Sequence, residues 1–144
     1  MKKLLVAALV SLMAFTSSGA SAQQIEHLYV SGPGGAFTTY TVPLIVITQG
    51  DTITYRNIDI AAHDVRATVF GPDRAWCMQF PFNFPSGKCP LFTSRLIGLS
   101  GTSPVYGIPD LVVPPSETAK TYEFFCSIHP NMKGTLVVVK RPLT

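Results

Sequence analysis

Short runs of β-forming residues, separated by turn signals, constrain the fold of this chain more than any other feature. The runs are rich in Val, Ile, Thr, Tyr and Phe, and Gly, Pro, Asn and Asp stand between them. Repeated short strands with turns between them are typical of an all-β sandwich or barrel. After residue 22 we find no convincing helix, no internal repeat and no linker between domains. The predicted strands are residues 27–30, 36–42, 44–48, 51–57, 63–70, 111–114, 119–125 and 134–139.

The segment of residues 71–110 departs from this pattern. It is crowded with proline and glycine and has no clear period, so we expect a long loop excursion from the sandwich. Because such a loop cannot build a core alone, we expect a disulfide to staple it. Its aromatic side chains could form either a small core under the loop or an apolar docking surface; they are Trp76, Phe80, Phe82, Phe84, Phe92 and Tyr106.

Residues 1–22 have the features of a secretory signal peptide. Two lysines precede an uncharged apolar run over residues 4–15, and Ala-Ser-Ala at 20–22 matches the small residues before a cleavage site. The alternative is an N-terminal membrane anchor, but about twelve apolar residues are too few to span a bilayer. We therefore predict a mature protein of residues 23–144, forming one domain without a membrane span, in the periplasm or secreted.

The charge balance argues against a nucleic-acid partner. Without the two lysines of the predicted signal peptide, nine basic and eight acidic residues remain. Such a chain lacks the excess of positive charge by which proteins bind phosphate backbones. We expect a monomer whose partners are other proteins.

Three cysteines, Cys77, Cys89 and Cys126, give the first functional hint. An oxidising compartment favours disulfides, so an odd cysteine needs a reason. Cys77 and Cys89 lie in the same proline-rich segment with eleven residues between them, whereas Cys126 is distant. The simplest pairing joins Cys77 to Cys89 and leaves Cys126 as a thiolate for another role. The alternative, in which Cys126 pairs with one of the others, would abolish any metal site at Cys126.

The stretch FFCSIHPNMKG, residues 124–134, places Cys126, His129 and Met132 at intervals of three residues. Thiolate and imidazole together favour copper, zinc or cobalt, and a thioether favours copper because zinc sites rarely use methionine. Two histidines and one cysteine in a plane, with a weak axial methionine, form the blue-copper electron-transfer site. Met132 alone could equally fill the core, but its spacing from Cys126 and His129 favours a ligand.

A second histidine must come from elsewhere, and the predicted mature chain offers only His27 and His63 besides His129. His63 follows a turn that begins at Asn57, so we place it at one end of the sandwich and predict that it completes the ligand set. His27 lies in the first predicted strand, where we expect an ordinary, partly exposed residue. Met78 follows Cys77, and we expect it to pack within the excursion.

Two stretches of the chain resemble the halves of a cupredoxin, a family of small blue (type 1) copper proteins that includes plastocyanin, amicyanin and pseudoazurin. Residues 43–65 match the strand, Gln-Gly-Asp turn, strand and Asn-x-Asp-x-x-x-His pattern that delivers the upstream histidine. Residues 121–139 match the pattern Cys-x-x-His-x-x-Met-x-Gly, in a short form similar to that of amicyanin. The resemblance implies a Greek-key β-sandwich with one copper ion per chain. Residues 71–110 fall outside it.

The resemblance implies four copper ligands, which are His63 Nδ1, Cys126 Sγ, His129 Nδ1 and, on the axis, Met132 Sδ. In the family, the residue after the upstream histidine is tied to the residue after the cysteine, and here these are Asp64 and Ser127. A carboxylate–hydroxyl hydrogen bond between them would make the site rigid. Many relatives carry asparagine at this position, so we expect the charge of Asp64 to favour Cu(II) and to lower the redox potential.

The leading functional hypothesis is an exported one-electron carrier that moves electrons between redox-partner proteins, with His129 as the electron port. The alternative is a periplasmic copper-binding protein for trafficking or resistance, which often uses Met- or His-rich tracts that this chain lacks. We do not expect an enzyme, because further copper centres require more than the three histidines present. A disulfide-stabilised β-sandwich for adhesion remains the simplest non-metal alternative.

Overall fold

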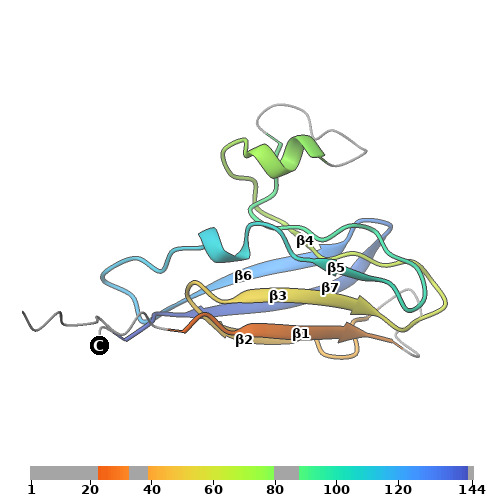
Figure 1. Ribbon diagram of the computed structural model, residues 1–144, viewed down its shortest axis with the longest axis horizontal. Coiled ribbons are helices and arrows are strands. Elements are labelled where there is room, and N and C mark those ends of the chain that lie inside the picture. The colour runs from red at the N-terminus through yellow and green to blue at the C-terminus, as the bar shows by residue number, and fades with distance from the viewer. Residues whose placement is uncertain (1–22, 33–38, 80–87, 143–144) are drawn as a thin grey trace, which may run out of the picture.

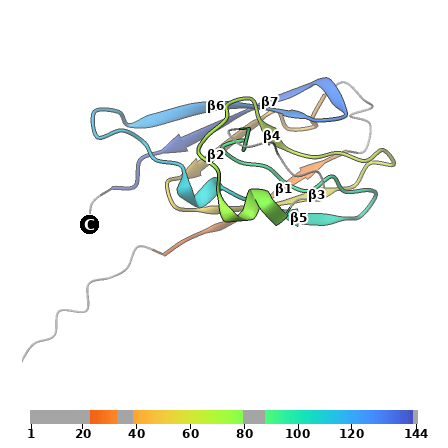
Figure 2. The same cartoon turned by 90° about the horizontal axis from the view of Figure 1, so that it is seen from above.

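The computed structural model describes residues 23–32, 39–79 and 88–142 of the chain. These residues form two β-sheets, one with strand order β1-β3-β5 and one with strand order β2-β7-β6-β4 (Figure 1). The view from above places β6 and β7 on one side of the molecule and β1, β3 and β5 on the other (Figure 2). The strands are β1 (Glu26–Ser31), β2 (Leu44–Thr48), β3 (Thr52–Asn57), β4 (Arg66–Ala67), β5 (Thr102–Pro104), β6 (Ala119–Cys126) and β7 (His129–Val139). The all-β sandwich expected from the sequence is confirmed.

Two short 3₁₀ helices, η1 (Ala75–Gln79) and η2 (Ile108–Asp110), interrupt the described chain. Neither of these helices is long and apolar enough to cross a membrane. The predicted signal peptide lies outside the described residues, as do Phe80, Phe82, Phe84 and the first part of the predicted strand at 36–42.

Alternation along β6 and β7 builds the core beneath the site. Tyr122, Phe124 and Cys126 of β6 are buried, and the residues between them are more exposed. On β7 the buried set runs through every second residue from Met132 to Val138. Because successive side chains of a strand point to opposite faces, Cys126 and Met132 share the inward face of this sheet with the core.

Aromatic rings fill the space between the two sheets. Tyr29 of β1 packs edge-on against Phe124 of β6, with ring centroids 5.9 Å apart. Tyr40 lies 5.0 Å from the same Phe124 ring, and Phe92 approaches it from another side at 6.5 Å. Contacts of this kind add about 0.5–1.5 kcal/mol each beyond the burial of apolar area. The aromatic core therefore joins both sheets at Phe124. Cys126 is two residues further along β6.

Three predicted strands differ in the structure, and in two of them a main-chain amide donates a hydrogen bond to a side chain. Within residues 63–70 only Arg66–Ala67 forms a strand, because the Val65 amide donates to Ser94 Oγ at 2.9 Å instead of to a ladder partner. Residues 111–114 form no strand, although Leu111 and Val113 are buried, because the Val113 amide donates to Gln49 Oε1 at 3.1 Å. Residues 39–42 also lack strand structure.

We predicted that residues 71–110 form one long loop outside the sandwich. The described residues of this segment instead form two parts. The first part, with η1, stands away from the sandwich (Figure 1), and the disulfide Cys77–Cys89 closes it as predicted. Trp76 of this part stacks on Tyr106 of the second part, with ring centroids 6.1 Å apart. Met78, which we expected to pack inside, is 68% exposed.

The second part, from Pro90 onward, returns to the sandwich. Phe92, Val105 and Ile108 are buried in the core, and β5 pairs with β3. Apolar residues can be buried in a core even when their spacing has no helical or strand period. In that case single side chains point inward, and the segment has no continuous apolar face. The sequence pattern therefore did not reveal β5.

A buried carboxylate ties the N-terminal strand to the opposite end of the chain. Asp51 is buried and accepts hydrogen bonds from the amides of Ile25 (3.2 Å) and Thr48 (3.1 Å). It also contacts His27 Nε2 at 2.9 Å and Arg141 Nη2 at 2.7 Å. Burial alone raises the pKa of the Asp51 carboxyl, but the hydrogen bonds and the Arg141 charge outweigh it and hold this pKa below its usual range. His27 is thus a partly exposed strand residue, as expected.

We predict that the stabilisation provided by Asp51 depends on pH. A carboxyl whose pKa is lower in the folded than in the unfolded state stabilises the fold above its unfolded pKa of about 4. This stabilisation is lost as the pH falls through the folded-state pKa. Asp51→Asn should lower the free energy of unfolding by about 1–3 kcal/mol at pH 7, and this difference should shrink below about pH 4. Urea unfolding at several pH values measures it, and a constant difference would contradict the prediction.

We also predict that Gly134 is required for packing. It lies opposite Phe124 in the ladder, and a Cβ at this position would collide with the Phe124 ring. Gly134→Ala should lower the free energy of unfolding by about 1–3 kcal/mol through overpacking. Gly98→Ala is the matched control, because a Cβ there has no heavy atom within 4 Å. Equal unfolding midpoints for the two variants would refute this account.

Candidate metal centre

His63 is held at one end of the sandwich by a turn that begins where β3 ends. The Asn57 side chain organises this turn, because its Nδ2 donates to Ala61 O at 2.7 Å and to Ile97 O at 3.0 Å. The backbone of His63 pairs with that of Ile97 through two hydrogen bonds of 3.0 Å. Both the main chain and the fully buried side chain of His63 are therefore fixed.

The hairpin of β6 and β7 delivers the other predicted ligands. Cys126 pairs with His129 across a tight turn, and the next pair along the ladder is Phe125 with Lys133. One step along β6, from Phe125 to Cys126, therefore corresponds to four steps along β7. The three residues 130–132 form a bulge between the two pairs. The bulge carries Met132, and the Cys126–His129 pair at the end of the hairpin lies beside His63.

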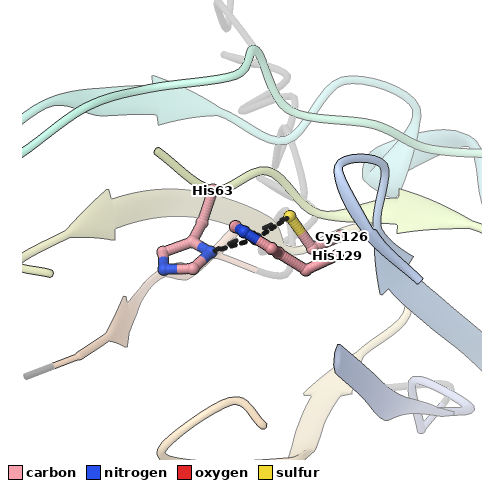
Figure 3. Close-up of side chains that lie close together, drawn as sticks. All are labelled: His63, Cys126 and His129. Atoms are coloured by element: carbon pink, nitrogen blue, oxygen red, sulfur yellow. Dashed lines mark hydrogen bonds between the residues drawn. The ribbon is translucent and has the colours of Figure 1, made fainter. Parts of the chain in front are cut away.

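Three donor atoms meet where these two segments approach each other (Figure 3). Cys126 Sγ lies 3.8 Å from His63 Nδ1 and 3.5 Å from His129 Nδ1, and the two Nδ1 atoms are 3.2 Å apart. His63 and Cys126 are fully buried, and His129 is half-buried. No other such group of three or more His, Cys, Asp or Glu ligands occurs in the part of the chain that the structure describes.

The size of this triangle suits a metal ion. In the plane of the three atoms, the point equidistant from them lies about 2.0 Å from each. Bonds from zinc to imidazole nitrogen or thiolate sulfur are about 2.0–2.3 Å long. The fourth predicted ligand, Met132, is fully buried and belongs to the same core cluster as Cys126. The residues present thus fit one small, soft or borderline ion.

The Cys126 thiol lies in a dry environment. Burial raises its pKa above the ordinary value, and backbone hydrogen bonds offset this only in part. A metal ion must therefore displace the thiol proton when it binds, which makes binding depend on the affinity of the ion for sulfur.

Asp64 links the two segments that carry the predicted ligands. Its Oδ1 accepts a hydrogen bond from the Ser127 amide and its Oδ2 accepts one from Ser127 Oγ, both at 2.6 Å. Arg66 Nη2 lies 3.7 Å from Oδ2, and the Tyr40 hydroxyl donates to the Asp64 carbonyl at 2.5 Å. The buried carboxylate holds the residue after His63 against the residue after Cys126.

Two neighbours of the cluster were not found by sequence reasoning. Ile97 pairs with His63 from an irregular segment, where no periodicity marks a pairing partner. Asp59 Oδ2 lies 3.4 Å from His63 Nε2. The spacing of four residues between Asp59 and His63 could have drawn attention to it, since this aspartate is part of the motif that contains the histidine.

The sandwich and its cluster of one thiol and two imidazoles define a small all-β protein with a group of side chains that could hold a metal ion. No protein-family model and no curated protein matches the chain. Among solved structures, a reduced mutant of amicyanin is 21% identical, with a TM-score of 0.50 over 83% of this chain and 86% of that chain. Amicyanin from Paracoccus versutus is 17% identical, with a TM-score of 0.48 over 83% and 85% of the two chains. The first likeness identifies the fold as that of a cupredoxin, as the motifs predicted.

We predict that the link through Asp64 stabilises the metal-free protein. Asp64→Ala leaves the Ser127 amide without its acceptor and should lower the free energy of unfolding by about 1–3 kcal/mol. Ser127→Ala removes only the hydroxyl bond and should cost less, about 0.5–1.5 kcal/mol. Asp110→Ala, which removes a half-exposed carboxylate, is the control. Denaturant unfolding measures all three, and equal losses for Asp64→Ala and Asp110→Ala would contradict the role of the link.

Proposed function

We propose that this protein binds one copper ion and acts as an exported one-electron carrier between redox-partner proteins, not as an enzyme. The ligands in this proposal are His63 Nδ1, Cys126 Sγ and His129 Nδ1, with Met132 Sδ on the axis. The observation that carries the proposal is the triangle of thiol and imidazole atoms, with edges of 3.2–3.8 Å.

The chemistry of the donor set favours copper over other metals. Zinc sites of structural type use four cysteine or histidine ligands, and here the described chain brings together three. A thioether together with two imidazoles and a thiolate is the donor set that type 1 copper uses. Met132 supplies a buried thioether in the same core cluster as Cys126. When bound, copper would supply a one-electron couple between Cu(II) and Cu(I).

The surroundings of the site favour electron transfer over metal delivery. His63, Cys126 and Met132 are fully buried, so an acceptor protein could not reach these ligands to take the metal. The two segments are held by the pairing of His63 with Ile97 and by the hydrogen bonds of Asp64, which limits rearrangement between redox states. His129 alone is half-buried, which supports it as the electron port.

The surface next to His129 supports contact with a protein partner. Ile128 is 49% exposed, and Pro130 on the other side of His129 is exposed as well. Apolar side chains around a redox-active histidine let two proteins approach without desolvating charges. Export rests on the signal-like residues 1–22 of the sequence.

The proposal is tested by the visible spectrum of the Cu(II)-loaded protein. We expect the intense sulfur-to-copper band in the visible that makes such sites blue, and we expect reversible reduction to bleach it. Cys126→Ser and His63→Gln should abolish the band, whereas His27→Gln, the matched control at the histidine outside the cluster, should retain it.

A colourless Cu(II) complex, or a protein that holds only Cu(I), would overturn the carrier proposal and favour copper trafficking. A band that survives Cys126→Ser would overturn the assignment of the ligands.

A further inference from the structure

The buried carboxylate of Asp59 lies behind the predicted ligand His63, on the side away from the cluster. Its Oδ2 is 3.4 Å from His63 Nε2, and both side chains are nearly or fully buried, with exposures of 9% and 0%. His63 Nδ1 is the ring atom that approaches Cys126 Sγ and His129 Nδ1. The imidazole therefore presents one nitrogen to the cluster and the other to a carboxylate.

The position of Asp59 is determined by its own neighbours and not by His63 alone. Its backbone amide donates to Asn57 Oδ1 at 2.9 Å, and its Oδ1 accepts from the Ile60 amide at 2.7 Å. Gly32 lies against it, and a Cβ on Gly32 would come within 2.7 Å of the Asp59 Cβ. With Oδ1 occupied, Oδ2 is the oxygen that faces the histidine.

This arrangement favours one of the two tautomers of neutral His63. A neutral imidazole has one N–H and one lone pair, and a carboxylate can only accept a hydrogen bond. When Nε2 carries the proton, it can donate a hydrogen bond to Asp59. The lone pair of Nδ1 is then directed at the cluster. The opposite tautomer would place two acceptors 3.4 Å apart in a buried site and would block the metal-binding nitrogen.

We propose that Asp59 is a positioning residue, which holds His63 as the Nε2–H tautomer and increases the donor strength of Nδ1. Its effect on the metal rests on the proposed copper function, whereas its effect on the tautomer does not. A carboxylate hydrogen-bonded to a metal-binding imidazole orients the ring and raises its basicity. The negative charge also favours Cu(II) over Cu(I), because the more highly charged ion gains more from it.

The first experiment uses the metal-free protein. Long-range ¹H–¹⁵N NMR at about pH 8, where an ordinary imidazole is neutral, reports the tautomer of each histidine. We expect wild-type His63 to be protonated on Nε2, Asp59→Asn to retain this tautomer through its amide oxygen, and Asp59→Ala to give a mixture.

The matched control is Asp51→Asn, which alters the other buried aspartate that contacts a histidine. Asp51 pairs with His27, and the strand β3 separates it from the turn that carries Asp59. We expect this variant to lose stability while the His63 tautomer stays unchanged, which separates positioning from general destabilisation.

The second experiment measures copper binding, with a competing chelator for affinity and voltammetry for the potential. Asp59→Ala should weaken Cu(II) binding about 10–100-fold. Asp59→Asn, which keeps an acceptor but loses the charge, should lower the ratio of Cu(II) to Cu(I) affinity about tenfold, a rise in potential of about 59 mV for one electron. Asp51→Asn should change neither quantity.

The proposal is overturned if wild-type His63 is protonated on Nδ1 in the metal-free protein, or if Asp59→Ala keeps the wild-type tautomer. It is also overturned if a blue copper complex forms with the same affinity and potential in Asp59→Ala as in the wild type. A wild-type protein that forms no blue complex refutes the carrier function instead, and the NMR measurement then still decides whether Asp59 sets the tautomer.

Discussion

The site depends on how β6 pairs with β7. A regular hairpin would continue the ladder from Phe125 with equal steps on both strands, and it would leave no room for a bulge. Here residues 130–132 stand between the Cys126–His129 pair and the Phe125–Lys133 pair. The regular part of the ladder anchors this bulge to the core through Phe124, whose ring occupies the space that Gly134 leaves open. The packing of one aromatic ring against one glycine thereby positions the loop of predicted ligands.

Two carboxylates connect this hairpin and the His63 turn to the rest of the fold. Asp64 bridges the two segments through Ser127, and Asp59 lies behind His63. Burying a carboxylate is costly unless it is hydrogen-bonded, and Asp64 and Asp59 are buried with partners. Their hydrogen bonds hold the segments that carry the donor atoms together whether or not a metal is present. A site organised in advance in this way suits redox chemistry better than a site that must form around its metal.

Much of the architecture could be read from the chain because local rules set it. Runs of β-forming residues between turn signals identified β1, β2, β3, β6 and the second half of β7, and cysteine spacing identified the Cys77–Cys89 disulfide. Prediction failed where main-chain groups bond to side chains, as Val65 does to Ser94 and Val113 does to Gln49. In those places apolar residues are buried without belonging to a ladder, so a strand-like pattern does not produce a strand.

The sequence by itself determined which groups are candidates for metal binding, since it places a cysteine, a histidine and a methionine at intervals of three residues. It also indicated which distant histidine would join them, because a turn-forming segment after a strand places His63 at one end of the sandwich. Only the tertiary structure decided the distances among the donor atoms, the contact of Asp59 with His63 and the return of residues 90–110 to the core. These features arise from contacts between segments that are far apart in the chain or that lack periodicity, and pairing of that kind leaves no signature in local sequence.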